Sequence, residues 1–199
     1  MRELVYYAAV SLDGYIAGPE GQFDAFLFEG DHMPSLIRRF ADAIPTDIAG
    51  AHGIEQGGSM FDTVVMGWNT YAVGLPDNMT SPYRHLRQVV FSRRRTESDI
   101  PGEHPNLSVT ADDPVEVVRR LKQRAGKSIW LCGGGSLANA LVGEIDRLVL
   151  KRNPLLFGGG IPLFAPGSYS PQRFQHVETV AYQSGVVVSE HVRSPRSAG

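Results

Sequence analysis

Residues 128–141 read Ser128-Ile129-Trp130-Leu131-Cys132-Gly133-Gly134-Gly135-Ser136-Leu137-Ala138-Asn139-Ala140-Leu141. An apolar run meets three glycines and helix-forming residues follow at once, an order typical of a strand, a tight turn and the start of a helix. Glycine lets a phosphate approach the main chain because no Cβ is in the way. The N–H groups of the new helix then face that phosphate at the positive end of the helix dipole. We therefore predict that this turn holds the phosphate groups of a nucleotide cofactor.

Two other interpretations of this turn are open. A glycine triplet can also form an ordinary strand-to-helix turn that binds nothing. Gly133, Gly135 and Ala138 fit a degenerate form of the glycine pattern in doubly wound dinucleotide folds. Such folds place an acidic residue about 20 positions further on. Glu144 and Asp146 come too early for that position, so the sequence disfavours a doubly wound fold.

Length and composition indicate an ordinary globular protein. The chain has 199 residues, of which 42% are hydrophobic and 20% charged, with a formal net charge of −2. We expect a single domain over residues 1–192 and a disordered tail over residues 193–199. The charge balance does not favour nucleic acid or a membrane surface as partner. The single cysteine, Cys132, allows no internal disulfide, and the start of the chain lacks a signal-peptide pattern, so we expect a cytoplasmic protein.

Three further strand ends carry residues suited to a binding site. Leu4 to Val10 is apolar without alternation, which predicts a central strand, and Asp13 follows it. Asp62 to Met66 predicts another strand, followed by Gly67 and a helix that Asn69 or Thr70 could cap. Gln88 to Ser92 predicts a third, with Arg93 directly after it. Ligand sites in open α/β sheets gather at such ends, although Asp13 beside Gly14 is also typical of a simple turn.

The remaining segments complete the expected fold. Residues 19–32 contain Phe23, Phe26 and Phe28 and form either a lid over an aromatic substrate or a loop pinned to the core. A second glycine triplet, Gly158 to Gly160, either lines a pocket for a flat ring or forms a bulge. We expect helices over residues 33–44 and, capped by an aspartate, over residues 113–126. Residues 173–182 and 186–192 predict an antiparallel hairpin.

Several motifs resemble the dihydrofolate-reductase-like superfamily. In chain order these are Ala9…Ser11-Leu12-Asp13-Gly14…Ile16-Ala17, Val65-Met66-Gly67-x-x-Thr70, Phe91-Ser92-Arg93 and Gly133-Gly134-Gly135-Ser136. The run from Ile145-Asp146-Arg147-Leu148-Val149-Leu150 through Pro154-Leu155-Leu156-Phe157-Gly158-Gly159-Gly160-x-Pro162-Leu163-Phe164 is similar to a narrower group. That group is the reductase (C-terminal) domain of the bifunctional riboflavin-biosynthesis deaminase–reductase.

The resemblance implies a three-layer α/β fold, NADPH as cofactor and hydride transfer to a heterocyclic or ring-opened substrate. The sheet would be mixed, mostly parallel, flanked by helices and closed by a C-terminal antiparallel hairpin. The cofactor-binding positions that it implies are Ala9, Ile16, Gly67, Trp68, Asn69, Thr70, Phe91, Ser92, Arg93, Cys132, Gly133, Gly134, Gly135, Ser136 and Leu137. Gly133 to Ser136 would hold the pyrophosphate, and Ser92 with Arg93 the adenosine 2′-phosphate. A dianionic phosphate favours a guanidinium, which agrees with NADP rather than NAD.

Two positions depart from the superfamily pattern. Trp68 stands where an arginine often follows the glycine of the second turn. Leu36 falls near the position of the carboxylate that dihydrofolate reductases use, so dihydrofolate reductase activity is disfavoured unless Glu29 or Asp31 takes its place. The riboflavin-type reductases resemble this chain in lacking that acid, and their carboxylate near the nicotinamide matches Asp13. A zinc deaminase needs a pair of cysteines, which this chain cannot supply.

We expect an NADPH-dependent reductase that acts on a small pyrimidine-like, pterin-like or ring-opened substrate. Asp13 would orient the substrate or relay a proton, and Phe26 and Phe157 would exclude water from it. A non-catalytic NADP-binding protein or sensor is the alternative from another class, and dihydrofolate reductase is the third. The resemblance also implies a homodimer, and no metal is expected.

Overall fold

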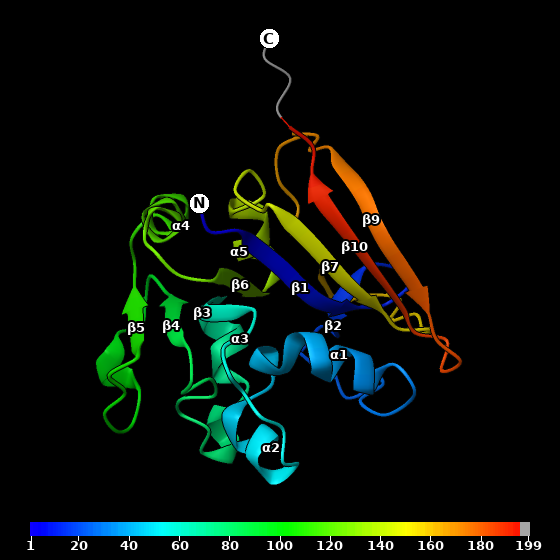
Figure 1. The fold of residues 1–199 in the computed structure, drawn as a ribbon. Helices are drawn as coiled ribbons and strands as arrows, with labels where there is room; N and C mark the ends of the chain where they lie inside the picture. Colours follow the sequence, from blue (N-terminus) through cyan, green and yellow to red (C-terminus); the bar gives the residue numbers. More distant parts are fainter. Residues whose placement is uncertain (196–199) are drawn as a thin grey trace.

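The computed structural model describes residues 1–195 and is built around one large sheet (Figure 1). In the described chain this sheet has eight strands in the order β5-β4-β3-β6-β1-β7-β10-β9. Its strands are β1 (Leu4–Val10), β3 (Phe61–Gly67), β4 (Arg87–Phe91), β5 (Leu107–Thr110), β6 (Ser128–Gly133), β7 (Arg147–Arg152), β9 (Phe174–Ala181) and β10 (Val187–Arg193). The pairs from β5 to β7 are parallel, and β10 is antiparallel to both β7 and β9. The expected mixed, mostly parallel sheet with a C-terminal antiparallel pair is confirmed.

A short two-stranded sheet lies beside the large one. It pairs β2 (Tyr15–Ala17) with β8 (Ile161–Pro162) in antiparallel fashion. Its two strands come from the segments that follow β1 and β7. The turn after the first strand is therefore joined to the glycine-rich segment 154–165.

Helices cover both faces of the large sheet. They are α1 (Met33–Phe40), α2 (Thr46–Ala51), α3 (Trp68–Ala72), α4 (Pro114–Gln123) and α5 (Gly135–Ala140), with 3-10 turns η1 (Ala41–Ala43), η2 (Leu75–Asp77) and η3 (Glu97–Asp99). Figure 1 shows α1, α2 and α3 on one side of the sheet and α4 with α5 on the other. Within residues 1–195, no helix has the length and apolar character that crossing a bilayer requires.

Two apolar clusters form because neighbouring strand residues point to opposite faces. In β1, Val5 joins the cluster that contains Leu36 and Phe40 of α1. Tyr6 joins the cluster that contains Val118 of α4 and Leu137 of α5. Burial of apolar surface on both faces explains why the central strands read as continuous apolar runs rather than alternating ones.

Several expected boundaries were wrong. Helix α1 ends at Phe40, short of residue 44, and Asp42 in the following 3-10 turn instead accepts the N–H groups of Met60 and Phe61. Helix α4 ends at Gln123, before residue 126. Asn69 and Thr70 do not cap α3, because the helix starts earlier, at Trp68, with Gly67 as its N-cap and no side-chain cap.

The end of the chain also differs from the expected tail over residues 193–199. Strand β10 includes Arg193, whose guanidinium Nε donates to the Ile145 carbonyl oxygen at 2.6 Å. Residues 196–199 lie outside the described residues, so the remainder of that expectation stays a prediction.

Candidate functional site

The carboxyl ends of β1, β3, β4 and β6 meet at one edge of the sheet because these strands pair in parallel. Gly67 is aligned with Phe91 across β3 and β4. Met66 is aligned with Gly133 across β3 and β6. The structure therefore brings the turns after four predicted strands to the same edge, as ligand sites in such sheets require.

Gly133 and Gly134 lie beside two other predicted site residues. A Cβ placed on Gly133 would be 3.9 Å from Ile16 Cδ1 and 3.9 Å from Thr70 Oγ1. A Cβ placed on Gly134 would be 3.4 Å from Thr70 Oγ1, and the peptide bond between the two glycines is cis. A Cβ on Gly67 would meet no atom within 4 Å. Open space thus lies at Gly67, whereas Gly133 is buried and a Cβ on Gly133 or Gly134 would make ordinary contacts with Ile16 or Thr70.

Gly135 has a different role from the one expected of the whole triplet. A Cβ on Gly135 would overlap the carbonyl oxygen of Pro162, and the Gly135 carbonyl accepts the N–H of Ala165 at 3.0 Å. Gly160 is similar, because a Cβ there would overlap the carbonyl oxygen of Ala17. Both glycines permit close contact between main-chain segments. The predicted role of Gly135 at the phosphate thus stays an expectation for its main-chain N–H, and the contact at Gly160 favours the main-chain alternative for the second triplet over a ring pocket.

The start of α5 presents polar groups at this edge. Ala138 N–H bonds to the Gly134 carbonyl, but no acceptor in residues 1–195 takes the N–H of Ser136 or Leu137. The Ser136 side chain is exposed, whereas the Leu137 side chain is 8% exposed and belongs to the core. Leu137 can therefore contribute only its main-chain N–H to a ligand.

The segment after β4, residues 92–95, contains three consecutive arginines, and we call it the basic corner. Ser92 Oγ accepts the N–H groups of Arg94 and Arg95, at 3.2 and 2.9 Å. Arg93 is exposed and forms no hydrogen bond or ion pair with residues 1–195. The Arg95 guanidinium lies 5.7 Å from the ring centroid of Trp68, and its Nη1 is 3.3 Å from Asp99. Arg95 thus brings a positive charge to the first residue of α3, a contact that no local sequence pattern indicates.

Asp13 holds two loops together. Its carboxylate accepts the Ser11 hydroxyl and the N–H groups of Phe157 and Gly158. The hydrogen bond from Ser11 has the largest effect and lowers the pKa of Asp13. Desolvation raises this pKa, and the N–H groups of Gly158 and Phe157 lower it further, so the net direction is down. Asp13 is thus an ionised acceptor at neutral pH, which suits positioning of residues 157–158 better than donation of a proton.

The loop with the aromatic residues is pinned to the core. Phe26 is 5% exposed, and its ring centroid lies 5.1 Å from that of Phe157. Leu27 N–H donates to Asn153 Oδ1 at 3.0 Å, and the Leu27 carbonyl accepts from Lys151 Nζ. Sequence reasoning missed Lys151 and Asn153, although a lysine directly after the apolar run 148–150 was a signal.

The other predicted residues lie in varied surroundings. Burial raises the pKa of the Cys132 thiol to about 12, and this side chain packs in the core near Tyr83. Phe91 packs against the core cluster on the side of α4, and Asn69 is exposed on α3. Ala9 is half-buried, and its Cα is aligned with that of Lys151 in the neighbouring strand.

Leu36 falls near the position at which the resemblance implies the carboxylate of a dihydrofolate reductase. Leu36 of α1 is 5% exposed and packs in the core. Asp31 accepts the N–H groups of Gln183 and Ser184, which ties it to the C-terminal hairpin. Glu29 is exposed at the surface.

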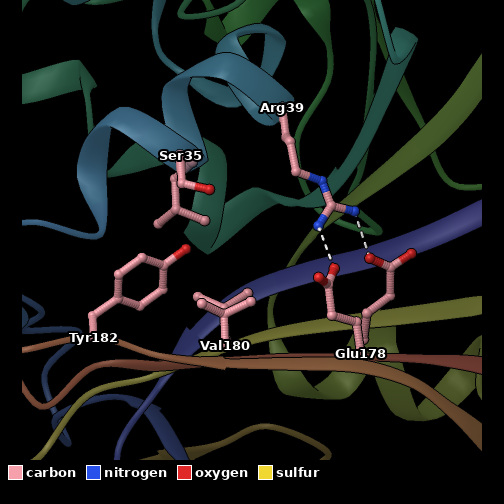
Figure 2. Close-up of a pocket in the computed structure, with 8 residues that line it drawn as sticks. Ser35, Arg39, Glu178, Val180 and Tyr182 are labelled. Carbon is pink, nitrogen blue, oxygen red and sulfur yellow. Dashed lines mark hydrogen bonds and ion pairs between the residues drawn. The ribbon is translucent and has the colours of Figure 1, made fainter.

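Two cavities lie away from this edge. Figure 2 shows the first, of about 120 Å³ between α1 and the β9–β10 pair, where Arg39 points toward Glu178. The second, of about 160 Å³, lies between α4 and strands β4 and β5 and is lined partly by Arg87, Arg120 and Arg124. Neither cavity contains a residue of the predicted cofactor site.

Comparison with known families and relatives gives consistent results. The family model of the RibD C-terminal domain matches residues 2–188. Two uncharacterized proteins of Bacillus subtilis strain 168 are each 31% identical to this chain. YwjB matches over 166 residues, which are 82% of this chain and 83% of YwjB. YyaP matches over 195 residues, which are 94% of this chain and 92% of YyaP.

Solved structures show the same fold. A candidate riboflavin biosynthesis protein from Shewanella sp. PV-4 aligns over 97% of this chain and 99% of its own, with a TM-score of 0.71 and 22% identity. Dihydrofolate reductase from Enterococcus faecalis, solved with NADP(H), aligns over 97% of both chains with a TM-score of 0.62 and 17% identity. The deaminase/reductase of Thermotoga maritima aligns over 97% of this chain and 57% of its own, with a TM-score of 0.61 and 17% identity.

Proposed function

Since the chain belongs to the RibD C-terminal domain family, we propose that it is an NADPH-dependent reductase of small pyrimidine-like, pterin-like or ring-opened substrates. One observation carries the proposal most: Gly133 and Gly134 lie beside Thr70 and Ile16, with the open space at Gly67 and the basic corner at the same edge. The fold is the dihydrofolate-reductase-like one, as its structural neighbours show.

The residues at this edge fit a phosphorylated dinucleotide. The unpaired N–H groups of Ser136 and Leu137, with the Thr70 hydroxyl, would hold the pyrophosphate. The Ser92 hydroxyl and the unpaired Arg93 would take the adenosine 2′-phosphate through charge-assisted hydrogen bonds. An NAD site would instead favour a carboxylate on the ribose hydroxyls, and the residue after β4 is a serine followed by arginines.

The substrate would lie at the β1 end of the same edge. Ala9 and Ile16 would border the nicotinamide, which supplies a hydride when the cofactor is bound. Phe26 and Phe157 would form an apolar wall that excludes water. Asp13 would hold Phe157 in place through the main-chain N–H groups that it accepts.

Thermal unfolding with each cofactor tests the proposal, because a ligand of the native state raises its stability by mass action. We expect a larger increase in Tm with NADPH than with NADH at the same concentration. Arg93→Ala should reduce this difference, and Arg124→Ala, an exposed arginine that follows α4, should not. Equal increases with both cofactors, or none, would overturn the cofactor assignment.

The buried Leu36 at the position of the missing acid gives weight to a second candidate, an NADP-binding protein without catalysis. NADPH oxidation at 340 nm separates the two candidates. Suitable acceptors are dihydrofolate, 7,8-dihydropterin and ribosylaminopyrimidines with and without a 5-phosphate. Turnover with one of them supports the reductase. NADPH binding without any turnover supports the binding protein.

A further inference from the structure

Lys151 is a buried charged residue that the cofactor site does not use. It is 6% exposed, and its Nζ donates to the Leu27 carbonyl and lies 5.6 Å from the centroid of the Phe28 ring. No carboxylate in residues 1–195 lies within ion-pair distance of it. Lys122, also 6% exposed, is the contrasting case, because its Nζ is 2.6 Å from Asp146 and 3.9 Å from Glu144. Burying an ammonium group without a carboxylate partner lowers the stability of the folded protein, which indicates that Lys151 serves a function.

Lys151 lies next to the position proposed for the nicotinamide. Its Cα is aligned with that of Ala9 in the parallel pair of β1 and β7. Aligned residues in neighbouring strands point to the same face, with Cα atoms about 5 Å apart. The side chain of Ala9 is a single methyl group, and the residue is only half-buried. A ring that rests on Ala9 therefore has the lysine beside it.

The other titratable groups near this position are poor proton donors. Asp13 is ionised, since its hydrogen bonds lower its pKa. Burial raises the pKa of the Cys132 thiol to about 12 and also raises that of Tyr7. Burial lowers the pKa of His32, which leaves this imidazole neutral, with its nitrogens at Ser184 Oγ and the Leu27 carbonyl.

Lys151 has the properties that the others lack. Burial lowers its pKa from 10.5 to about 8, so it carries a proton at neutral pH and can release it. An arginine could not do so, because a guanidinium keeps its proton in proteins. The chain has 3 lysines among its 19 basic residues, and Lys151 is the buried one without a carboxylate partner.

We propose that Lys151 is the catalytic acid of the reduction, which rests on the proposed function. A hydride from the reduced nicotinamide adds with its electron pair to the electrophilic carbon of a C=N or C=O bond of the substrate. The π electron pair of that bond moves to the heteroatom. Lys151 Nζ gives its proton to this heteroatom, becomes a neutral amine and is protonated again from water. Between turnovers the Leu27 carbonyl holds the ammonium in place.

The first test needs no substrate, because the oxidised nicotinamide ring carries a positive charge and the reduced ring does not. Selective 15N labelling of lysine gives few side-chain signals, and Lys151→Arg identifies the one from Lys151. The titration of that signal is followed in the NADPH complex and in the NADP+ complex. The other charged or titratable groups that face Lys151 are the same in both complexes, so they do not contribute to a difference between the two titrations. These groups are His32 from the loop before α1, Tyr7 from β1, and Glu190 from β10 with its ion-pair partners Arg39 and Arg147.

We expect the Lys151 titration to lie at lower pH in the NADP+ complex, by about half a unit or more, because two positive charges lie close together. The side-chain signal of Lys127, an exposed lysine just before β6, should have the same chemical shift in both complexes at neutral pH. Identical Lys151 titrations in two well-formed complexes would overturn the assignment and leave the cofactor site standing. Failure of both cofactors to bind would overturn the proposed function and this assignment with it.

The second test measures turnover with the dihydrofolate, dihydropterin and pyrimidine acceptors named above. Lys151→Arg keeps a cation and should fold with a Tm near that of the wild type, but kcat should fall at least 100-fold with a smaller change in KM. Lys151→Ala should be equally slow and partly rescued by propylamine, whereas tetramethylammonium, which has no N–H, should not rescue it. Lys127→Ala should behave as the wild type. Wild-type kcat in Lys151→Arg, or no turnover with any acceptor, would overturn the role of Lys151.

Discussion

Gly135 shows at the scale of one residue how a glycine can serve the fold rather than a ligand. The main chain at Pro162 lies against its Cα, so a methyl group there forces the two segments apart. We predict that Gly135→Ala lowers the free energy of unfolding by about 1–3 kcal/mol. Urea denaturation measures this change.

Gly50 provides the matched control for Gly135. It lies in α2, and a Cβ there meets no atom within 4 Å. Gly50→Ala should therefore leave stability unchanged or raise it by up to about 1 kcal/mol, since alanine favours the helix. If Gly135→Ala is as harmless as Gly50→Ala, the close contact with segment 162–165 is not present in solution.

Lys151 gives the stability of the protein a specific pH dependence. Its pKa is lowered from 10.5 to about 8 in the folded state, so between these pH values the unfolded chain binds more protons than the folded one. Stability rises with pH wherever the unfolded state binds more protons. We predict that the wild type gains up to about 3 kcal/mol relative to Lys151→Met between pH 8 and pH 10.5. Urea denaturation of both proteins across this range measures it, and parallel curves would show that Lys151 is not desolvated.

At the scale of elements, helix α4 depends on its N-cap. Asp113 accepts the N–H groups of Val115 and Glu116, at 2.9 and 3.1 Å, and Pro114 occupies the first helical position. We predict that Asp113→Ala lowers the free energy of unfolding by about 1 kcal/mol, because two main-chain donors lose their acceptor. Asp112→Ala, which removes only an exposed pair with Arg120, should cost less than half of that. Equal losses in urea denaturation would argue against the cap.

The aromatic loop before α1 depends on one amide side chain. Asn153 is fully buried; its Oδ1 accepts Leu27 N–H, and its Nδ2 donates to the Lys151 carbonyl. We predict that Asn153→Ala increases hydrogen exchange at the Leu27 amide at least tenfold, because that amide loses its acceptor. Exchange in the strands of the sheet centre should change much less. Unchanged exchange at Leu27 would mean that the loop is held in another way.

Sequence patterns predicted the elements better than the contacts between them. The apolar runs of β1 and β6 and the Asp-Pro start of α4 each indicate their own element, because burial on both faces and helix capping leave local signatures. The predicted end of α1 was wrong because Asp42 accepts hydrogen bonds from residues almost 20 positions away, which no local pattern shows.

At the scale of the whole molecule, the site is only partly readable from the sequence. The turns at Gly67 and Gly133 could be placed at one edge because parallel strands end together. The contact between Arg95 and Trp68 and the hydrogen bonds of Leu27 with Asn153 and Lys151 could not be predicted. They depend on the tertiary arrangement of distant loops, which no local pattern shows. Likewise, the sequence does not show that Gly135 differs from Gly133 and Gly134 in its surroundings. That difference arises because segment 162–165, from a later part of the chain, packs against Gly135.

We also propose from family resemblance that the protein forms a homodimer. Light scattering coupled to size-exclusion chromatography should then give about twice the chain mass of 21.7 kDa at micromolar concentration. A mass of one chain under these conditions would remove the dimer from the proposal. It would leave the cofactor site unaffected, because every residue assigned to that site comes from one chain.

A crystal structure of the protein grown with NADP+ tests the cofactor site most directly. We expect the pyrophosphate at the N–H groups of Ser136 and Leu137 beside Thr70, the 2′-phosphate within hydrogen-bond distance of Ser92 or Arg93, and the nicotinamide over Ala9. A dinucleotide bound elsewhere, or crystals at saturating NADP+ with no ligand at this edge, would show that the edge is not a cofactor site.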